Sequence, residues 1–272
     1  MKPAAFEFIR AASIAEASRI LAQSQGAARV VAGAQSLGPM LNLRLARPRI
    51  LVDITGIREL LHVEQKSDAL FIGACITHAN IEDGSVPDVT AGAMRSVAAG
   101  IAYRAVRNRG TIGGSVCHAD PAADWVSLLT ALDAECIIAG VDGERRVPTA
   151  DFVTGAYETA LRTGELLKAI RVPRLSRHGR CGYYKICRKA GEFALAIGVV
   201  VIDPERDLFR AVLAAANGRP IVIPDMSPLR NKEGHIDDAS LVQVLENNGI
   251  INRVDSRQKS AAIKRAYRQA AA

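Results

Sequence analysis

Glycine and small hydroxyl residues are concentrated in one short stretch of the chain, Asn108 to Ser115, which reads N-R-G-T-I-G-G-S. Three glycines fall within five positions, Gly110 to Gly114. Glycine has no Cβ atom and adopts backbone conformations that other residues avoid, so the N–H groups of such a stretch can close around an anion. The stretch therefore predicts a loop that binds phosphate, with ligand-free tight turns as the alternative.

A second glycine-containing loop is predicted upstream. Arg29 to Ala32 has the pattern of a buried strand, Gly33 to Gly38 interrupts it, and Pro39 suits the first position of a following helix. A helix N-terminus offers free N–H groups and a positive dipole end to an anion. Because this loop lies about 80 residues before the first, the two together suit a diphosphate, and a dinucleotide is the natural ligand.

Other nucleotide and catalytic signatures fit less well. Neither loop matches G-x-G-x-x-G or G-x-x-x-x-G-K-[ST], which argues against a Rossmann or P-loop site. Ala34 to Gly38 is one residue away from the G-x-S-x-G nucleophile elbow of hydrolases. Too little chain precedes it for a hydrolase sheet, and no histidine stands in a context that suggests a triad partner. Without a hydrolase site, two roles remain for Ser36, a contact to phosphate or the cap of a helix.

Five segments occur in an order that is typical of a known family. They are Val31–Leu37, Val52–Ile54, Ile72–Ala74, Thr111–Asp124 and Tyr184–Arg188. With these segments the chain looks like the FAD-binding medium subunits of molybdenum-containing hydroxylases, and is similar to the flavoprotein of carbon monoxide dehydrogenase and the flavin domain of xanthine dehydrogenase. The resemblance covers about residues 3 to 200 and is loose beyond them.

The resemblance implies a divided FAD site in which both loops hold the pyrophosphate. It places Asp124 at the adenosine end, on a ribose hydroxyl, and Ile101 against the adenine, whereas Leu167 and Lys185 approach the flavin. An Asp at the start of a helix can also be no more than a cap, and Lys185 could be an exposed strand lysine. The residues implied in the two loops are Val31, Ala32, Gly33, Ala34, Gln35, Ser36, Leu37, Thr111, Ile112, Gly113, Gly114 and Ser115.

Three departures from the family pattern are visible. Ala34 stands where a second glycine is usual, which the loop accommodates only if the φ angle of Ala34 is negative. Glu192 stands where the family has Asp, and residues 214–218 replace a glycine-rich turn. The last of these concerns the C-terminal region rather than the FAD site.

The resemblance also implies a role and partners. The chain would be an oxidoreductase subunit whose FAD accepts electrons from an iron–sulfur partner and passes them to an external acceptor, without a catalytic side chain of its own. The expected partners are a small subunit with 2Fe-2S clusters and a large subunit with the molybdopterin cofactor, assembled as a dimer of heterotrimers. The alternatives are a stand-alone FAD-dependent oxidoreductase and a nucleotide-binding module without turnover.

Composition narrows the remaining classes. The 272 residues, 49% of them hydrophobic, are enough for two globular domains. No apolar run approaches the length of a membrane span and the N-terminus lacks the apolar region of a signal peptide, so a cytoplasmic protein is expected. The five cysteines form no C-x-x-C pair, and the five histidines no i, i+4 pair, so no metal site is predicted.

The net charge of +7 equals the seven Lys and Arg residues of the acid-free segment 171–189. A second basic cluster, Arg253 to Arg268, lies on a predicted terminal helix. No nucleic-acid-binding motif accompanies these bands and aromatic residues make up only 4%, so nucleic acid is not expected as a partner. A solvated face or a protein-partner surface fits them better.

The periodicity of the chain predicts an α+β fold. A small β-α-β-α-β layer is expected over residues 1–56 and a larger α/β part over 57–175, together forming an FAD-binding domain, followed by a C-terminal domain over 176–272 with an antiparallel sheet and helices. The main predicted helices are Ile14–Ala22, one from Pro39, His78–Glu82, Val89–Ala102, one from Asp124, Leu241–Asn247 and Ser256–Ala271. The strands are Phe6–Phe8, Arg29–Ala32, Ile50–Val52, Ala69–Ile72, Glu135–Ala139, Arg145–Pro148, Leu166–Val172, Gly182–Ile186, Leu195–Ile202 and Leu208–Leu213.

Overall fold

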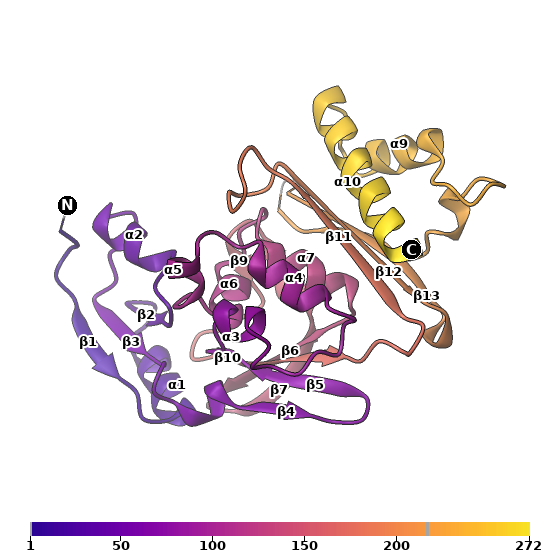
Figure 1. Cartoon of the computed structure of the whole chain (residues 1–272). Coiled ribbons are helices and arrows are strands. Elements are labelled where there is room, and N and C mark those ends of the chain that lie inside the picture. The colour runs from indigo at the N-terminus through magenta and orange to yellow at the C-terminus, as the bar shows by residue number, and fades with distance from the viewer. Residues whose placement is uncertain (1, 216–217) are drawn as a thin grey trace.

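The computed structural model describes residues 2–215 and 218–272, and it has the predicted mixed α/β architecture (Figure 1). The first layer is a three-stranded parallel sheet in the order β1-β3-β2. Its strands are β1 (Glu7–Arg10), β2 (Ala28–Val31) and β3 (Ile50–Asp53). The predicted β-α-β-α-β layer is thereby confirmed.

Local sequence explains both helices of this layer. Helix α1 (Ile14–Gln23) starts at Ser13, whose hydroxyl accepts the Glu16 N–H at 3.1 Å, as a serine N-cap should. Helix α2 (Leu37–Asn42) starts before Pro39, so the prediction that this proline takes the first helical position is wrong. Proline is tolerated there because N–H groups of the first turn have no partner within the helix.

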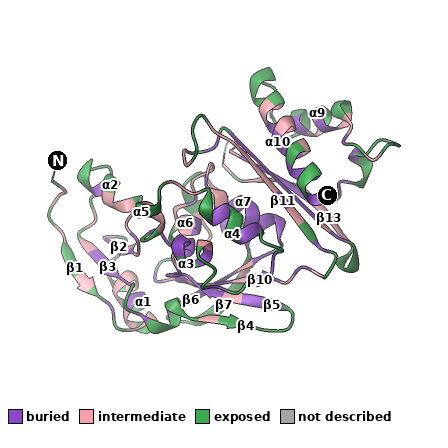
Figure 2. Cartoon of the chain, in the orientation of Figure 1, coloured by how far each residue is buried: buried purple, intermediate pink, exposed green. Residues whose placement is uncertain are grey.

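The second layer is a five-stranded antiparallel sheet in the order β4-β5-β10-β6-β7. Helices cover one of its faces, and the largest hydrophobic core lies between sheet and helices, with Trp125 and Phe152 fully buried (Figure 2). Its strands are β4 (Val63–Gln65), β5 (Ala69–Gly73), β6 (Glu135–Gly140), β7 (Gly143–Pro148) and β10 (Leu166–Pro173). The helices are α3 (His78–Glu82), α4 (Ala93–Ala99), α5 (Arg104–Arg107), α6 (Ile112–His118), α7 (Asp124–Ala131) and α8 (Thr149–Phe152).

Two predictions in this layer are wrong. The long helix expected over Val89–Ala102 is only α4, because the Asp88 carboxylate binds the N–H and the hydroxyl of Thr90 and Gly92 has a φ of +87°. That turn precedes the helix and delays its start. The glycine-rich stretch is not a loop throughout, since Gly113, Gly114 and Ser115 form the first turns of α6.

The third layer is the predicted antiparallel meander, in the order β11-β12-β13-β14. Its strands are β11 (Arg180–Ile186), β12 (Ala196–Asp203), β13 (Leu208–Ala214) and β14 (Ile221–Ile223). Strand β12 contacts α7 on one face and α10 (Arg253–Ala271) on the other. Burial on both faces explains why its sequence is apolar almost throughout instead of alternating.

Helix α10 lies unusually close to the sheet. A Cβ atom built on Gly182 would lie 1.8 Å from the carbonyl oxygen of Ala266, and one on Gly198 would lie 2.6 Å from the carbonyl carbon of Ala262. Glycine in the strands and alanine in the helix thus allow backbone to approach backbone. Helix α9 (Asp238–Asn247) adds Leu241 and Leu245 to the same core.

The remaining elements are short. They are the 3-10 helices η1 (Arg58–Leu61), η2 (Pro204–Arg206) and η3 (Ser227–Leu229) and the strands β8 (Val153–Gly155) and β9 (Glu158–Thr159). No helix of the described residues is both long and apolar enough to traverse a bilayer. The second sheet ends with β10 at Pro173 and the third begins with β11 at Arg180, on either side of the domain boundary predicted at residue 175. The domain limits themselves stay a prediction. Ala216 and Asn217, part of the altered turn at 214–218, lie outside the described residues.

We predict that Gly182→Ala lowers the free energy of unfolding by about 1–3 kcal/mol, the usual cost of overpacking a tight contact. The added methyl group would collide with the backbone of α10. Gly56→Ala is the matched control, because a Cβ atom there has no neighbour closer than 4.0 Å. Urea denaturation of both variants measures the difference, and equal stabilities would contradict the close packing of α10.

Candidate functional site

The two glycine segments predicted to cooperate lie in direct contact. A Cβ atom built on Gly33 would be 1.9 Å from the carbonyl oxygen of Arg109 and 2.9 Å from the Cα atom of Gly110. Only glycine allows this approach at position 33. The turn after β2 and the residues before α6 therefore lie directly against each other, although one follows a strand of the parallel sheet and the other leads into a helix of the second layer.

The first segment offers backbone donors. Within the described part of the chain, the N–H groups of residues 33–37 donate no hydrogen bond, and the first N–H engaged after them is that of Gly38, to the Ala34 carbonyl at 2.8 Å. Ser36 is the N-cap of α2 but its hydroxyl makes no capping bond. Consecutive free N–H groups form an anion-binding nest. The segment thus fits an anion, whereas the reading of Ser36 as a capping side chain is wrong.

Backbone strain marks the same segment. Ala34 has a φ of +59°, so the expectation that an alanine here requires a negative φ is wrong. The left-handed conformation costs a non-glycine residue about 1–2 kcal/mol. Ala215, in the second region where the family's glycine is replaced, likewise has a φ of +58°. Both alanines thus adopt a left-handed conformation that glycine adopts without this cost.

The N–H groups of the second segment differ from those of the first, because they have hydrogen-bond partners within the chain. The N–H groups of Ile112 and Gly113 donate to the carbonyls of Ile76 and Ala74, and that of Gly114 donates to the Thr111 hydroxyl at 3.0 Å. These three N–H groups thus have partners within the chain, and the placement of residues 111–115 at the pyrophosphate stays a prediction. Gly114 is exposed, and the one atom that a Cβ there would approach within 4 Å is the Thr111 hydroxyl, at 2.8 Å. This segment supplies an open surface free of side chains instead of donors.

A buried histidine supports the second segment from behind. The His78 N–H donates to the Gly110 carbonyl at 2.9 Å, and a Cβ atom on Gly110 would lie 2.9 Å from His78 Nε2. The Trp125 indole donates to His78 Nδ1 at 3.0 Å. Burial, and then the positive charge of Arg107, lower the pKa of His78 to about 4. His78 is therefore neutral at physiological pH, and nothing in the sequence pattern singled it out.

Asp124 is the first residue of α7, but Ala123 is the N-cap and no side chain caps the helix. The Asp124 carboxylate instead binds two residues of β11: its Oδ1 atom accepts the Tyr183 hydroxyl at 2.5 Å and pairs with Lys185 Nζ at 2.8 Å. Burial, and then the Asp124 charge, raise the pKa of Tyr183 well above its ordinary value. The reading of Asp124 as a simple cap is wrong.

Lys185 also donates to the carbonyl of Gly100 at 3.0 Å, next to Ile101. The structure thus groups Lys185 with Asp124 and Ile101, the two residues that the resemblance assigns to the adenosine end. Leu167 lies in β10, buried in the core beside a register shift. The assignment of Leu167 and Lys185 to the flavin stays a prediction, and the contacts of Lys185 favour the adenosine side.

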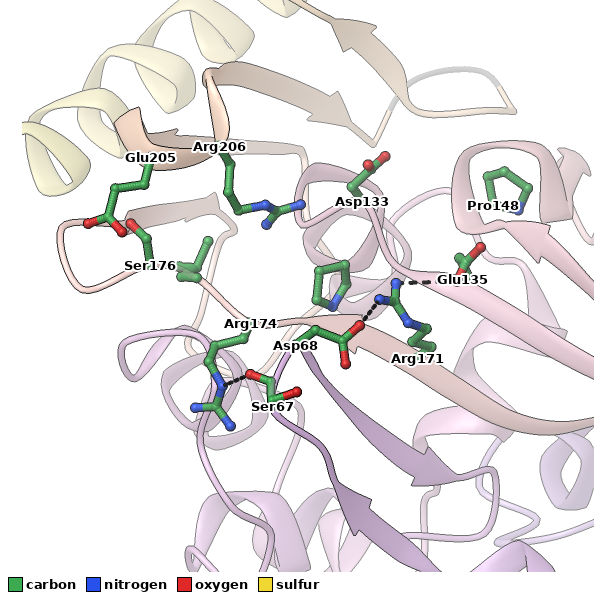
Figure 3. A pocket seen from close by; sticks show the side chains of 12 residues that line it. Ser67, Asp68, Asp133, Glu135, Pro148, Arg171, Arg174, Ser176, Glu205 and Arg206 are labelled. Carbon is green, nitrogen blue, oxygen red and sulfur yellow. Dashed lines mark hydrogen bonds and ion pairs between the residues drawn. The ribbon is translucent and has the colours of Figure 1, made fainter.

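A cavity of about 560 Å³ lies elsewhere, between the end of β10, the β4–β5 turn and η2 (Figure 3). Arg171 pairs there with Asp68 at 2.6 Å and with Glu135 at 3.3 Å. Arg174 donates to the Ser67 carbonyl at 3.0 Å. Because Arg171 and Lys185 are both paired with acids, the basic segment 171–189 does not form one free face. None of the glycine segments lines this cavity.

Other chemistry finds no support. No group of acidic, histidine or cysteine residues suited to a metal occurs among the described residues. Burial raises the pKa of the Cys75 and Cys136 thiols to about 12, as expected of inert apolar cysteines. None of the five histidines makes a hydrogen bond to Ser36, which removes the hydrolase reading.

Comparisons with known proteins agree with this geometry. Residues 4–175 match the family described as the FAD binding domain in molybdopterin dehydrogenase. A 6-hydroxypseudooxynicotine dehydrogenase complex subunit alpha of Paenarthrobacter nicotinovorans is 34% identical over 80% of this chain and 74% of that protein. Carbon monoxide dehydrogenase of Hydrogenophaga pseudoflava superposes with a TM-score of 0.90 at 28% identity, over 99% of this chain and 98% of the other. Quinoline 2-oxidoreductase of Pseudomonas putida 86 superposes with a TM-score of 0.87 at 31% identity, over 100% of this chain and 98% of the other.

We predict that His78 makes the stability of the protein depend on pH. Its pKa is lowered from 6.5 to about 4, so the folded state binds fewer protons than the unfolded state between these values. Stability is then lost as the pH falls through this window, by about 2 kcal/mol between about pH 7 and pH 5. Urea titrations at the two pH values measure this. His78→Asn, which keeps an acceptor for the Trp125 indole, should lose less stability over that range, and an unchanged pH dependence would refute the assignment.

Proposed function

The chain belongs to the family of FAD-binding domains in molybdopterin dehydrogenases, and we propose that it passes electrons from the iron–sulfur clusters of a partner subunit through FAD to an external acceptor. It is an oxidoreductase subunit with FAD as its cofactor. Its relatives include the medium chain of a carbon monoxide dehydrogenase, 35% identical over 74% of this chain.

The residues present fit FAD. The free N–H groups of residues 33–37 suit the negative charge of a pyrophosphate, and the exposed, side-chain-free Gly114 leaves room beside them. The close contact of Gly33 with Arg109 is the observation that carries the proposal, because it unites both segments around one position for a diphosphate. A simple turn would require neither the contact nor the unpaired donors.

We assign the other parts of the cofactor residue by residue. Asp124 accepts a hydroxyl of the adenosine ribose, Ile101 contacts the adenine, and Leu167 lies towards the flavin. Lys185 holds Asp124 and the Gly100 carbonyl on the adenosine side. We assign the pyrophosphate to the two glycine segments, residues 31–37 and 111–115, in which Ser36 and Gly114 are exposed and Val31, Gly33, Thr111, Ile112 and Gly113 are buried.

The isoalloxazine ring supplies redox chemistry in steps of one or two electrons. The side chains of this chain bind and orient it, and none is assigned as an acid, base or nucleophile. We propose a small subunit with 2Fe-2S clusters and a large subunit with the molybdopterin cofactor as partners, in a dimer of heterotrimers. A stand-alone FAD-dependent oxidoreductase is the alternative, and reduction of the flavin by organic substrate without partners would favour it.

Replacing Gly114 should remove FAD without unfolding the protein. In Gly114→Val a branched side chain occupies the exposed position, so FAD affinity should fall about tenfold or more, while the FAD-free chain stays folded and loses no more than about 2 kcal/mol, the cost of disturbing the Thr111 cap that the new Cβ atom would approach to 2.8 Å. Fluorescence titration with FAD and urea denaturation give the two quantities. Undiminished FAD affinity would mean that this segment is only structural.

Two further variants provide comparisons for the stability and the FAD affinity of Gly114→Val. Gly113→Ala should lose stability as well as FAD, because a Cβ atom there would lie 2.6 Å from the Ala74 carbonyl oxygen. Ser36→Ala should weaken FAD binding by about 1 kcal/mol, the value of one neutral hydrogen bond.

The partner proposal predicts different behaviour alone and in a complex. Co-expression with subunits of the iron–sulfur and molybdopterin types should give a stable assembly whose substrate reduces the FAD. The isolated chain mixed with the same substrate should keep its flavin oxidised, because its cysteines have no cluster spacing. Absorbance of the flavin records reduction and size-exclusion chromatography records assembly. A chain that stays monomeric in the co-expression would exclude the partners.

A further inference from the structure

We propose that Tyr183 positions the adenosine end of the cofactor site, by fixing the Asp124 carboxylate so that one of its oxygens is free to accept a ribose hydroxyl. The inference rests on the proposed role of Asp124 in FAD binding and adds a residue from the C-terminal sheet to it. Tyr183 would touch Asp124 and not FAD, which makes it a positioning residue.

The two oxygens of Asp124 have different surroundings. Both β11 donors, the Tyr183 hydroxyl and Lys185 Nζ, bind the Oδ1 atom, at 2.5 Å and 2.8 Å. The Oδ2 atom accepts no hydrogen bond from the described residues, yet it is not among the fully buried unpaired atoms. One oxygen is thus fixed by the protein, and the other stays accessible to a ligand.

The surroundings of the carboxylate make this orientation rigid. The side chains of Asp124 and Lys185 are only 12% and 10% exposed, so the ion pair is poorly screened by water. Tyr183 keeps its proton and remains a donor, because burial and the neighbouring carboxylate both oppose its ionisation. Its own backbone is held in turn by the Gln269 side chain of α10, which accepts the Tyr183 N–H at 2.9 Å.

A carboxylate oxygen held in this way is a strong acceptor for a hydroxyl group. Lys185 also binds the carbonyl of Gly100, the residue before Ile101, so the backbone beside the residue proposed to contact the adenine is tied to the same ion pair. The ligand chemistry that fits is a purine nucleoside with free ribose hydroxyls. The C-terminal sheet would then select for the adenosine part of FAD although it contributes nothing to the pyrophosphate segments.

The neighbouring tyrosine provides a matched control. Tyr184 alternates to the opposite face of β11, where its hydroxyl binds Arg265 and its ring lies 4.8 Å from that guanidinium group. Tyr183→Phe and Tyr184→Phe therefore remove the same atom from the same strand. Only the first removes a donor to Asp124.

The test uses the full chain freed of FAD, with FAD, ADP and 2′,3′-dideoxy-ADP as probes. FAD binding is followed by flavin fluorescence, and the two ADP compounds by displacement of FAD. In the wild type we expect ADP to bind about tenfold more tightly than its dideoxy analogue, the value of one charge-assisted hydrogen bond. Tyr183→Phe should reduce this preference towards one and weaken FAD binding, while Tyr184→Phe should keep it.

A wild-type preference that Tyr183→Phe fully retains would overturn the inference. If the wild type binds FAD but does not distinguish the two ADP compounds, the ribose role of Asp124 fails, and the inference with it, whereas failure to bind FAD at all would refute the proposed function itself. Lys185→Gln serves as a second variant should Tyr183→Phe not fold. It leaves Tyr183 as the main donor, so a residual ribose preference supports the inference and its complete loss contradicts it.

Discussion

The contact between Gly33 and the Arg109 carbonyl is the constraint on which the rest of the site depends. It joins a turn of the parallel sheet to the segment that enters α6, and any side chain at position 33 would separate them. His78 and Trp125 then hold Gly110 from the other side. The segment with free N–H groups, residues 33–37, is therefore fixed at Gly33 against a backbone that packing holds in place, in the way that preorganised binding sites are built.

Much of this arrangement could be predicted from local patterns. The Ser13 and Thr77 helix caps and the β6–β7 hairpin, whose turn is Val141-Asp142, rest on such short-range chemistry. The two glycine segments were found for the same reason. The helical state of Gly113 and Gly114 was missed, because intrinsic propensity opposes it and the Thr111 cap together with the burial of Ile112 and Val116 in the core stabilises it.

The unpredicted parts depend on contacts between distant residues. The hydrogen bond from Tyr183 to Asp124 joins positions 59 apart, and that from Trp125 to His78 joins positions 47 apart. No periodicity or motif carries such information, because each residue alone has an ordinary reading as a cap, a core aromatic or a strand residue. The same applies to Ala34 and Ala215, whose positive φ values are imposed by the surrounding fold against the preference of alanine.

The close docking of α10 has a consequence for the way the chain matures during synthesis. Helix α10 follows every strand that it covers, so β12 has one apolar face without its cover until residues 253–271 have been made. Exposed apolar strands of this kind promote association between incomplete chains. The core between the parallel sheet and its helices uses only residues that precede the meander, whereas the core around α7 is completed by β12 and β13. The C-terminal sheet is therefore the part of the nascent protein in which folding and aggregation compete longest.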